Sequence, residues 1–242
     1  MKLGLTMGIN SRRENLEGMG GFDISSVSGL QRWYKFETGI TLNGSNVSQW
    51  DDQSGNNVHL AQSTATQQPA YNAGNVHFDR VNDKMSMGAN IALTTFTIFM
   101  VIETDTTSSN NQTLFSGAVS NGQDFFRYDL TLWRFRPSSG AASQQTISHA
   151  LTNGEKFLLT VVGTDDSGTL NVAIRDNKAA IGNATCNSTA GSDTFNLQVI
   201  GDHNNTNQLW DGKISEIVVF NTALTGTDLD NVESDLMTRH GL

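Results

Sequence analysis

The sequence predicts an all-β sandwich that a single domain forms over residues 29–242. Short apolar runs recur along the chain, and turns rich in Gly, Asn, Asp and Ser separate them. Only 2 prolines occur in 242 residues. Both of them, Pro69 and Pro137, fall in predicted loops, where no hydrogen bond of a sheet is lost. A chain of this length can bury a large core without disulfides.

The first 28 residues differ from the rest, because they are rich in glycine and methionine and show no sustained apolar period. We expect them to form an extended arm outside the sandwich that docks on a partner. An unstructured terminus and an additional edge strand are the alternatives. The side chains predicted to make the docking contacts are Leu3, Leu5, Ile9, Arg12, Arg13 and Phe22.

The strongest strand predictions come from two runs that carry apolar residues on both alternating faces. Residues 96–102 and 157–162 should be central strands buried on both faces. Residues 170–175 alternate between apolar and polar side chains, which is typical of a strand with one wet face. The polar segment 163–168 should join the last two strands as a hairpin turn. Two further strands are predicted over 195–200 and 214–220.

A single amphipathic helix is predicted at the end of the sequence. Leu229, Val232 and Leu236 follow the spacing i, i+3, i+7 and therefore share one helical face. Thr227 is the expected N-cap, and Gly241 is the expected stop. Such a helix after a β-rich body must pack its apolar face on the outside of a sheet or on a partner.

Several motifs resemble a known family. They are Gly29–Tyr34, Val47–Asn56 with its Trp-Asp-Asp-Gln-Ser-Gly-Asn turn, Phe78–Asp83, and Trp210–Asn221 followed by the C-terminal helix. Together they are similar to the laminin-G-like members of the concanavalin A-like lectin/glucanase superfamily, in the form found in phage and bacterial surface proteins. The resemblance covers residues 29–242 and implies a concanavalin A-like jelly-roll β-sandwich. In that fold Trp33 and Trp50 would fill the space between the sheets.

The resemblance also implies a calcium site, since laminin-G-like domains often hold one ion at the rim of the sandwich. Hard cations prefer carboxylate and carbonyl oxygens. The candidate ligands are Asp79, Asp83, Asp202 and Asp211, all in predicted loops. Turn formation is the alternative role for each of them. No other cofactor is expected.

No catalytic constellation is present in the sequence, so we expect a protein without enzymatic activity. Glucanases of the superfamily carry Glu-x-Asp-x-x-Glu on one strand. The nearest match is Glu103-Thr104-Asp105, which Ser108 follows in place of a third acid. Glu216 is expected on a solvent-facing side with no acidic partner. Cys186, the only cysteine, is expected as an unreactive thiol in a polar loop.

Charge and hydropathy exclude two classes of partner. The formal net charge is -9, which repels nucleic acid, and no dense cluster of Lys and Arg offsets it. No stretch approaches the roughly 20 apolar residues that span a bilayer. Residues 1–10 are too short and too interrupted by glycine for a secretory leader. We therefore expect assembly in a reducing cytoplasm, consistent with the absence of a disulfide framework.

The densest aromatic cluster offers a candidate carbohydrate site. Two paired strands are predicted over 124–136, and exposed aromatic rings stack well on sugars. A core hairpin with solvated arginines fits the same string, and it is the interpretation that we favour. The candidate ligand-binding residues are Tyr128, Trp133, Arg134 and Arg136.

Two functional hypotheses follow. The first is a phage virion protein, a capsid decoration or head/tail accessory subunit, assembled in the host cytoplasm. Its arm would dock on the major capsid protein or another virion protein, an arrangement that suits a homo-oligomer. The second is a carbohydrate-binding or adhesion module of a fibre or cell surface, which would recognise host glycans. A glycanase is disfavoured because the acidic triad is missing.

Overall fold

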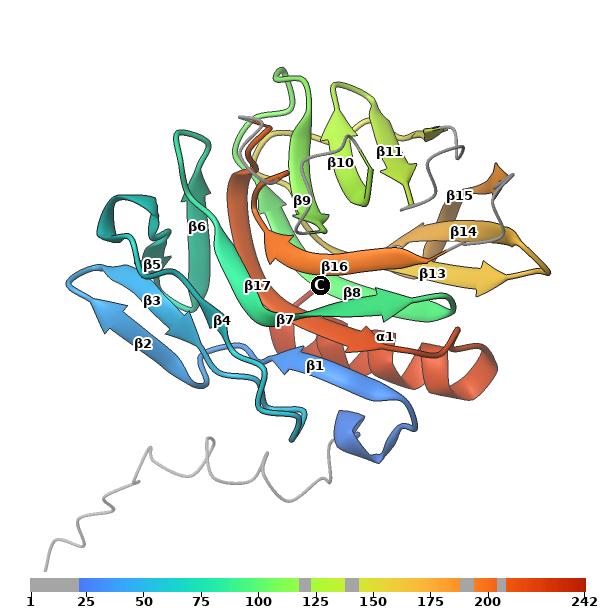
Figure 1. Cartoon of the computed structure of the whole chain (residues 1–242), viewed down its shortest axis with the longest axis horizontal. Helices are drawn as coiled ribbons and strands as arrows, with labels where there is room; N and C mark the ends of the chain where they lie inside the picture. The colour runs from blue at the N-terminus through green and yellow to red at the C-terminus, as the bar shows by residue number, and fades with distance from the viewer. Residues whose placement is uncertain (1–21, 118–122, 138–143, 188–193, 204–207) are drawn as a thin grey trace, which may run out of the picture.

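The computed structural model describes residues 22–117, 123–137, 144–187, 194–203 and 208–242. Two layers of antiparallel strands face each other across a common core, and α1 (Gly226–His240) packs on the outside of one layer (Figure 1). This confirms the predicted all-β sandwich with a short C-terminal helix. The layer under α1 is called the helix layer below, and the other is called the open layer.

In the helix layer, β17 is central, because it pairs with β8 along one edge and with β6 and then β1 along the other. The sheet continues from β8 through β13 and β14 to β15, and β5 extends β6. The strands of the helix layer are β1 (Leu30–Tyr34), β5 (Ala70–Asn72), β6 (Asn75–Asp79), β8 (Phe96–Thr104), β13 (Lys156–Asp165), β14 (Thr169–Asp176), β15 (Ala179–Asn187) and β17 (Asp211–Phe220).

The open layer runs in the order β2-β3-β4-β7-β16-β9-β10-β11-β12. Its strands are β2 (Ile40–Asn43), β3 (Asn46–Trp50), β4 (Leu60–Ala61), β7 (Met85–Leu93), β9 (Gln112–Ser116), β10 (Phe125–Asp129), β11 (Leu132–Arg136), β12 (Gln145–Ser148) and β16 (Phe195–Ile200). A bridge between Asn46 of β3 and Ala70 of β5 links the two layers at one edge. Two short 3₁₀ helices, η1 (Ile24–Ser26) and η2 (Ala65–Gln67), complete the described elements.

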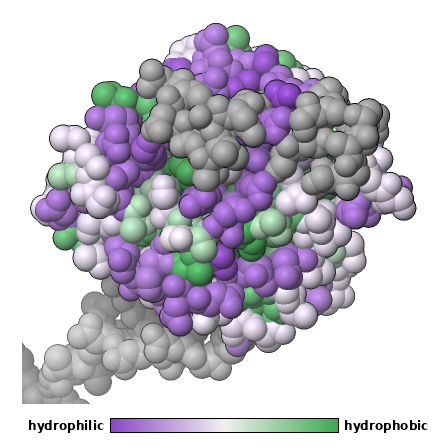
Figure 2. Space-filling model, viewed as in Figure 1, coloured by the Kyte–Doolittle hydropathy of each residue, from purple (hydrophilic) through white to green (hydrophobic). Residues whose placement is uncertain are grey.

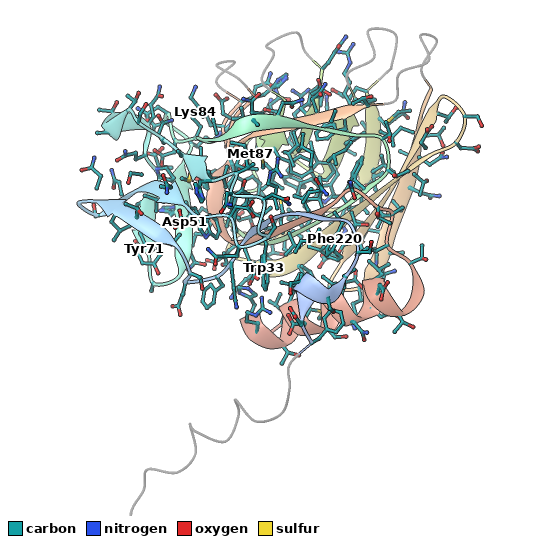
Figure 3. The ribbon with its side chains drawn as sticks, turned by 60° about the horizontal axis from the view of Figure 1, so that its bottom comes forward. Trp33, Asp51, Tyr71, Lys84, Met87 and Phe220 are labelled. Carbon is teal, nitrogen blue, oxygen red and sulfur yellow. The ribbon has the colours of Figure 1, made fainter. Side chains whose placement is uncertain are left out.

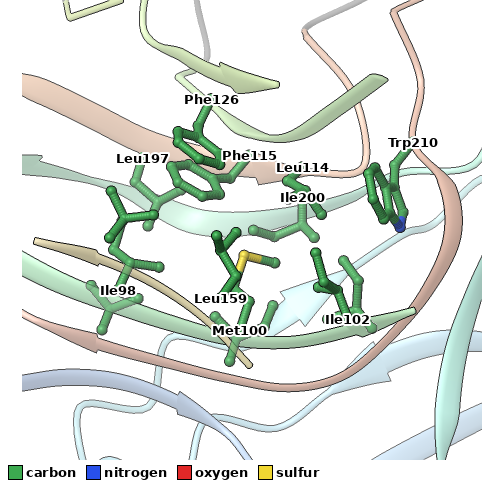
Figure 4. Packing of buried hydrophobic residues seen from close by; sticks show 14 of the residues in the cluster. Ile98, Met100, Ile102, Leu114, Phe115, Phe126, Leu159, Leu197, Ile200 and Trp210 are labelled. Carbon is green, nitrogen blue, oxygen red and sulfur yellow. The ribbon is translucent and has the colours of Figure 1, made fainter. Parts of the chain in front are cut away.

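The strand β8 shows why residues 96–102 carry apolar side chains on both faces of the strand. Ile98, Met100 and Ile102 point into the core between the layers (Figure 4), whereas Phe99 and Val101 point outward to α1. Side chains alternate between the two faces of a strand, so a strand that is apolar on both faces must be covered on both sides. The prediction of a central strand is confirmed, and α1 is the reason for it.

The predicted hairpin is confirmed as β13 and β14, which pair from Leu159–Asp176 to Asp165–Leu170. At the start of β17, Gly212 is required by close packing. A Cβ built there would lie 2.2 Å from the carbonyl oxygen of Glu103, and φ is +150°. Any side chain at this position would therefore separate β17 from β8.

The turn after β3 is organised around the buried carboxylate of Asp52. Its Oδ1 accepts hydrogen bonds from the backbone N–H groups of Trp33 (3.0 Å) and Ser54 (2.9 Å), and its Oδ2 accepts from Val58 N–H (3.2 Å). The Trp-Asp-Asp-Gln-Ser-Gly-Asn motif is therefore turn chemistry, as predicted. It connects β1 to the loop that precedes β4.

The helix α1 is held to the helix layer by a carboxylate on each side of the contact. Glu233 of α1 has no exposed surface. It accepts hydrogen bonds from Arg175 Nε (2.8 Å) and Nη2 (3.0 Å) on β14, and from Thr160 Oγ1 (2.9 Å) on β13. The apolar face predicted from Leu229, Val232 and Leu236 packs beside this contact. The helix begins at Gly226 after Thr225, earlier than the predicted Thr227 cap, and Gly241 ends it as predicted.

The second carboxylate is Glu216 of β17, and its predicted solvent-facing position is wrong. It is 1% exposed. Trp33 Nε1 donates to its Oε1 at 2.7 Å, His240 Nε2 lies 2.7 Å from its Oε2, and Arg239 pairs with it. A β-bulge next to Glu216 and the end of α1 enclose the side chain. No local pattern in residues 214–220 carries this information, because the partners come from elsewhere in the chain.

Two aromatic residues near the beginning of the described chain belong to this same contact. Trp33 lies in the cluster under α1, and not between the two layers as predicted; Trp50 does lie between them. Phe22, the one predicted docking residue among the described residues, packs against the same cluster, which also contains Ile24 and Val27. Figure 3 shows η1 and α1 together on one side of the sandwich, with Trp33 and Phe220 nearby. Leu3, Leu5, Ile9, Arg12 and Arg13 lie outside the described residues.

Cys186 lies in β15 and not in a polar loop as predicted. It is fully buried in the core and forms no disulfide. Small and polar residues dominate β15, so no local apolar pattern marks it as a strand, and its pairing with β14 decides its conformation. Within the described ranges, we found no helix whose length and apolarity would suit a bilayer crossing.

We predict that Glu233→Ala lowers the free energy of unfolding by about 3 kcal/mol, because it leaves the guanidinium of Arg175 and the hydroxyl of Thr160 without their acceptor. Urea denaturation of the full chain measures this. The control is Asp230→Ala, which removes an exposed carboxylate from the same helix and should change stability by less than about 0.5 kcal/mol. Equal effects of the two substitutions would contradict the role given to Glu233.

Candidate functional site

The candidate site is the outer face of the β10–β11 hairpin in the open layer. The two strands pair from Phe125–Arg136 to Asp129–Leu132. Side chains alternate along each strand, so one set points into the core and the other points away from it. The inward set is Phe126, Tyr128, Trp133 and Phe135. The outward set includes Arg127, Asp129, Arg134 and Arg136.

The inward rings form a packed aromatic cluster. Phe126 stacks on Trp133 with a centroid separation of 4.9 Å, and Tyr128 meets the same indole edge-on at 5.1 Å. Tyr128 and Trp133 are 0% and 1% exposed, and the hydroxyl of Tyr128 accepts the N–H of Leu151 at 3.0 Å. Neither ring offers a face to a ligand from solvent. Of the four predicted ligand-binding residues, only Arg134 and Arg136 therefore lie on the outward face.

The outward face brings three arginines together. Arg127 and Arg134 are direct cross-strand partners, and Arg136 follows two positions along β11. Arg134 forms an ion pair with Asp129, whose carboxylate lies on the same face. We call Arg127, Arg134 and Arg136 the arginine cluster. Arg127 is not among the predicted ligand-binding residues, although its alternation with the rings in the sequence was the available signal.

Arg127 is the best fixed member of the cluster. Its Nη1 donates to Gln208 Oε1 at 2.5 Å and its Nη2 donates to Gln144 Oε1 at 3.0 Å, while the guanidinium carbon lies 4.2 Å from the centroid of the Phe125 ring. The side chain is thus held by two amides and a ring, and it is 9% exposed. Neither glutamine was predicted as a site residue. Both lie in loops, and only the tertiary fold places these loops beside the hairpin.

The cluster carries an electrostatic cost. Burial, together with the positive charges of Arg134 and Arg136, lowers the pKa of Arg127 to about 10, and Asp129 opposes the shift. The Nε atoms of Arg127 and Arg134 are buried and have no hydrogen-bond partner among the described residues. A buried donor without an acceptor costs about 1–3 kcal/mol. The described protein atoms therefore leave the Nε donors of Arg127 and Arg134 without an acceptor.

The predicted calcium ligands separate into different contacts. Asp79 and Asp83 lie together, since Asp83 Oδ2 accepts the N–H of Asp79 at 3.0 Å. Asp202 lies 3.5 Å from Lys84 Nζ. Asp211 begins β17, opposite Asp79 in β6. A search of the described residues for three or more His, Cys, Asp or Glu side chains placed to hold a metal ion found no such group.

The acids closest to a glucanase motif are engaged with cations. Glu103 lies 2.5 Å from Lys213 Nζ, and Asp105 lies 2.6 Å from His77 Nε2 and 3.7 Å from the same lysine. They form a partly exposed polar row at the end of β8, next to β17 and β6. The hydrogen bond from Lys213 to Glu103 raises the pKa of the lysine.

The side of the molecule that carries the open layer is mainly hydrophilic (Figure 2). An antiparallel sandwich with one helix-covered layer and a polar outer face on the other has the architecture of a lectin-like domain. The chain belongs to the concanavalin A-like lectin/glucanases superfamily, because residues 79–230 match the model of its laminin-G-like family. A comparison with curated proteins gave no match.

Solved structures with a similar fold include two toxin binding domains and a sialidase. The binding domain of paraclostridial mosquitocidal protein 1 has a TM-score of 0.59 at 13% identity, covering 88% of this chain and 52% of that one. The ligand-binding domain of botulinum neurotoxin serotype D with N-acetylneuraminic acid gives 0.57 at 14% identity, covering 87% and 52%. Trypanosoma rangeli sialidase with the inhibitor DANA gives 0.58 at 15% identity, covering 86% and 33%. The chain spans about half or less of these proteins, and at such identities the likeness establishes the fold alone.

We predict that Asp83 makes stability depend on pH. Burial raises the pKa of Asp83 to about 6, whereas an unfolded aspartate titrates near 3.9. The folded state therefore holds the proton more tightly, and stability is full below about pH 4 and is lost as the pH rises through 6. The loss should reach at most about 3 kcal/mol, since one pKa unit corresponds to about 1.4 kcal/mol.

Urea denaturation at several pH values between 4 and 7 tests this with Asp83→Asn, which keeps an oxygen acceptor but cannot ionise. The variant should gain stability over the wild type as the pH rises, while Asp230→Asn, an exposed control, should not. A constant difference across this range would contradict the prediction. Bound calcium would favour the ionised carboxylate, so stabilisation of the wild type by added calcium at pH 7, absent in Asp83→Asn, would support the calcium site.

Proposed function

We propose that the domain is a non-catalytic carbohydrate-binding module whose ligand contacts the outer face of the β10–β11 hairpin. The observation that carries the proposal is the arginine cluster, where guanidinium groups gather on the outer face of a lectin-like sandwich and two glutamine side chains accept hydrogen bonds from one of them. Sugars are recognised by a small number of well-placed polar groups on a rigid surface. The names of the similar structures, one of which contains N-acetylneuraminic acid, are consistent with this class of ligand.

The absence of catalysis is part of the proposal. Glycoside hydrolysis needs two carboxyl groups that face each other across the scissile bond, one of them free to donate a proton. Glu103 and Asp105 are each paired with a cation, and Glu216 is enclosed by Trp33, Arg239 and His240. These contacts support structural roles for the three acids.

The second candidate function is the virion role, in which a phage decoration or head/tail accessory subunit docks by its N-terminal arm. The position of η1 favours it. η1 and Phe22 lie beside α1, whereas the β10–β11 hairpin lies at the opposite end of the molecule (Figure 1). A subunit anchored through the residues that precede Phe22 would present the hairpin away from the particle surface. Its partners would be capsid or other virion proteins, and its ligands would be host surface glycans.

We predict that the full chain binds glycans on a printed array and releases no reducing sugar from laminarin-type polymers. Binding should persist after a mild change of α1 that keeps the fold, such as Asp230→Ala. Absence of binding to every printed glycan would overturn the carbohydrate proposal. Sugar release above that of a buffer blank would overturn the non-catalytic part.

We predict that deletion of residues 1–21 abolishes association with particles and leaves a folded domain that binds the same glycans. The deletion ends before Phe22 because Ile24 and Val27 are buried in the core under α1. Co-sedimentation with purified particles measures association, and thermal unfolding verifies the fold. Undiminished co-sedimentation of the truncated domain would contradict docking by the arm.

A further inference from the structure

A groove crosses the outer face of the open layer over strands β2, β3, β4 and β7. Its two parts have volumes of about 460 Å³ and 570 Å³, and they adjoin each other at Gln49 and Ala61, which line both. These strands lie at the opposite end of the layer from β10 and β11 (Figure 1). Sites for small ligands are hollows of about 300–1,000 Å³. The groove therefore has the size of a binding site and is separate from the hairpin.

The register of the four strands explains the hollow. Thr41 pairs with Gln49, which pairs in turn with Ala61. Ala61 pairs with Ser86, so the four side chains form one row across the sheet. They point outward, because the neighbouring positions of each strand face the core. The side chains of Ala61 and Ser86 are short, and they leave room above the sheet where the two parts of the groove meet.

A β-bulge in β3 adds a second polar side chain to the groove. Thr41 pairs with Gln49, but Leu42 pairs with Val47, so Ser48 is an additional residue in β3. In a β-bulge, two residues of one strand oppose one residue of the partner strand. Ser48 and Gln49 therefore both line the groove opposite Thr41, whereas a regular strand would turn one of them to the core. Bulges often re-aim a side chain in this way beside a functional site.

One wall of the groove is fixed by a chain of carboxamides. Gln62 and Gln68 line it and are both buried. Gln68 Nε2 donates to Gln62 O at 2.7 Å, and Gln68 Oε1 accepts a hydrogen bond from Asn43 Nδ2 at 3.0 Å. Gln62 Nε2 donates to Lys84 O at 3.1 Å. The wall is therefore rigid before a ligand arrives, and little conformational entropy is lost on binding.

Other polar atoms of the groove are free to meet a ligand. The hydroxyls of Thr41 and Ser86 and the Oε1 of Gln49 have no hydrogen-bond partner among the described residues. Thr41 is an exposed residue, and the side-chain oxygens of Gln49 and Ser86 are open to solvent. Gln49 Nε2 donates to Asp51 Oδ1 at 2.7 Å, which orients the carboxamide. The groove thus offers oriented donors and acceptors that solvent can reach.

The lining is uncharged, which restricts the class of ligand. Among the described residues that line the groove, none is Asp, Glu, Lys or Arg, although such residues make up 16% of the chain. Hydroxyl and carboxamide groups of one part stand beside the apolar surface of Val58, Met87 and Ala89 in the other. A sugar ring without acidic groups has the matching chemistry, because its hydroxyls both donate and accept and its C–H faces are apolar.

We propose that the groove over β2, β3, β4 and β7 is a second carbohydrate site, which binds a neutral saccharide. The inference rests on the proposed carbohydrate-binding function for its class of ligand, and it differs from that proposal in the place and the charge of the site. The free oxygens of Thr41, Gln49 and Ser86 would contact the sugar hydroxyls. The net charge of -9 repels an acidic ligand and leaves a neutral one unaffected.

The test is binding of the full chain to a panel of uncharged polysaccharides, namely dextran, mannan, galactan and laminarin, measured by affinity electrophoresis and calorimetry. At least one of them should bind. Its affinity should change by less than about twofold as the salt concentration rises, because no charged side chain lines the groove. A strong loss of affinity at high salt would contradict an uncharged site.

Ala61→Leu is the decisive variant, because Ala61 is exposed and lies where the two parts of the groove meet. The larger side chain fills the hollow and removes no hydrogen bond. It should weaken neutral-saccharide binding by about tenfold or more and leave the melting temperature nearly unchanged. The matched control is Ala92→Leu, the same change at an exposed position of β7 that does not line the groove. It should change binding by less than about twofold.

A second variant tests the polar contacts. Thr41→Val keeps the shape of the side chain and removes its hydroxyl. It should weaken neutral-saccharide binding by about twofold to tenfold, as expected for the loss of one hydrogen bond. Unchanged affinity in both Thr41→Val and Ala61→Leu would overturn the groove as the site.

Arg134→Gln, which changes the hairpin alone, separates the two proposals. Neutral-saccharide binding that is lost in Ala61→Leu and retained in Ala92→Leu and Arg134→Gln would support the groove. Binding that is retained in Ala61→Leu and lost in Arg134→Gln would overturn the groove and leave the hairpin site standing. Binding of acidic saccharides alone would do the same. Failure to bind any saccharide, neutral or acidic, would overturn the carbohydrate-binding function and the groove with it.

Discussion

The pairing of two buried carboxylates with cations is the constraint on which the arrangement of the layers depends. Glu233 reaches from α1 to Arg175 and Thr160, and Glu216 reaches from β17 to Arg239 and His240. A buried carboxylate without such partners would lower the stability of the fold. If α1 moved away from the sheet, each carboxylate would lose its partners. Both contacts fix α1 on one outer face of the sandwich. That face is therefore apolar, and the outer face of the open layer is the one that can be polar and available to ligands.

The β10–β11 hairpin combines two roles through strand alternation. Its inward rings stack in the core, where Trp133 contacts both Phe126 and Tyr128. Its outward positions carry the arginine cluster. Since the same backbone serves both sets, the packing of the rings limits the movement of the arginines, and little conformational entropy remains to be lost when a ligand binds. A rigid aromatic base explains how like charges can be held close together at the surface.

The sequence predicts the fold well because its strongest signals are local. The run at 96–102 is apolar on both faces, and β8 is covered on both faces. The spacing of Leu229, Val232 and Leu236 likewise predicts one helical face. Contacts between distant segments are not encoded in this way. A glutamate among apolar residues is typically solvent-facing, so the burial of Glu216 by Arg239 and His240 could not be anticipated.

The candidate site is an intermediate case. Alternation at 124–136 places the arginines opposite the rings of Phe126, Tyr128, Trp133 and Phe135, and it favours a core hairpin without excluding exposed rings. Burial of Tyr128 and Trp133 decides this and moves attention from the rings to the arginines. The contribution of Gln144 and Gln208 depends on loop positions that only the tertiary structure provides.

The clustering of Phe22 and Leu242 under α1 has a consequence for presentation. Both ends of the described chain leave the same pole, and the arginine cluster lies away from it (Figure 1). Copies tethered at that pole, on a lattice or in a fusion, would all orient their outer hairpins in the same direction. A second weak contact would then form at high effective concentration, so avidity could exceed single-site affinity by a factor of about 10² or more without any new contact.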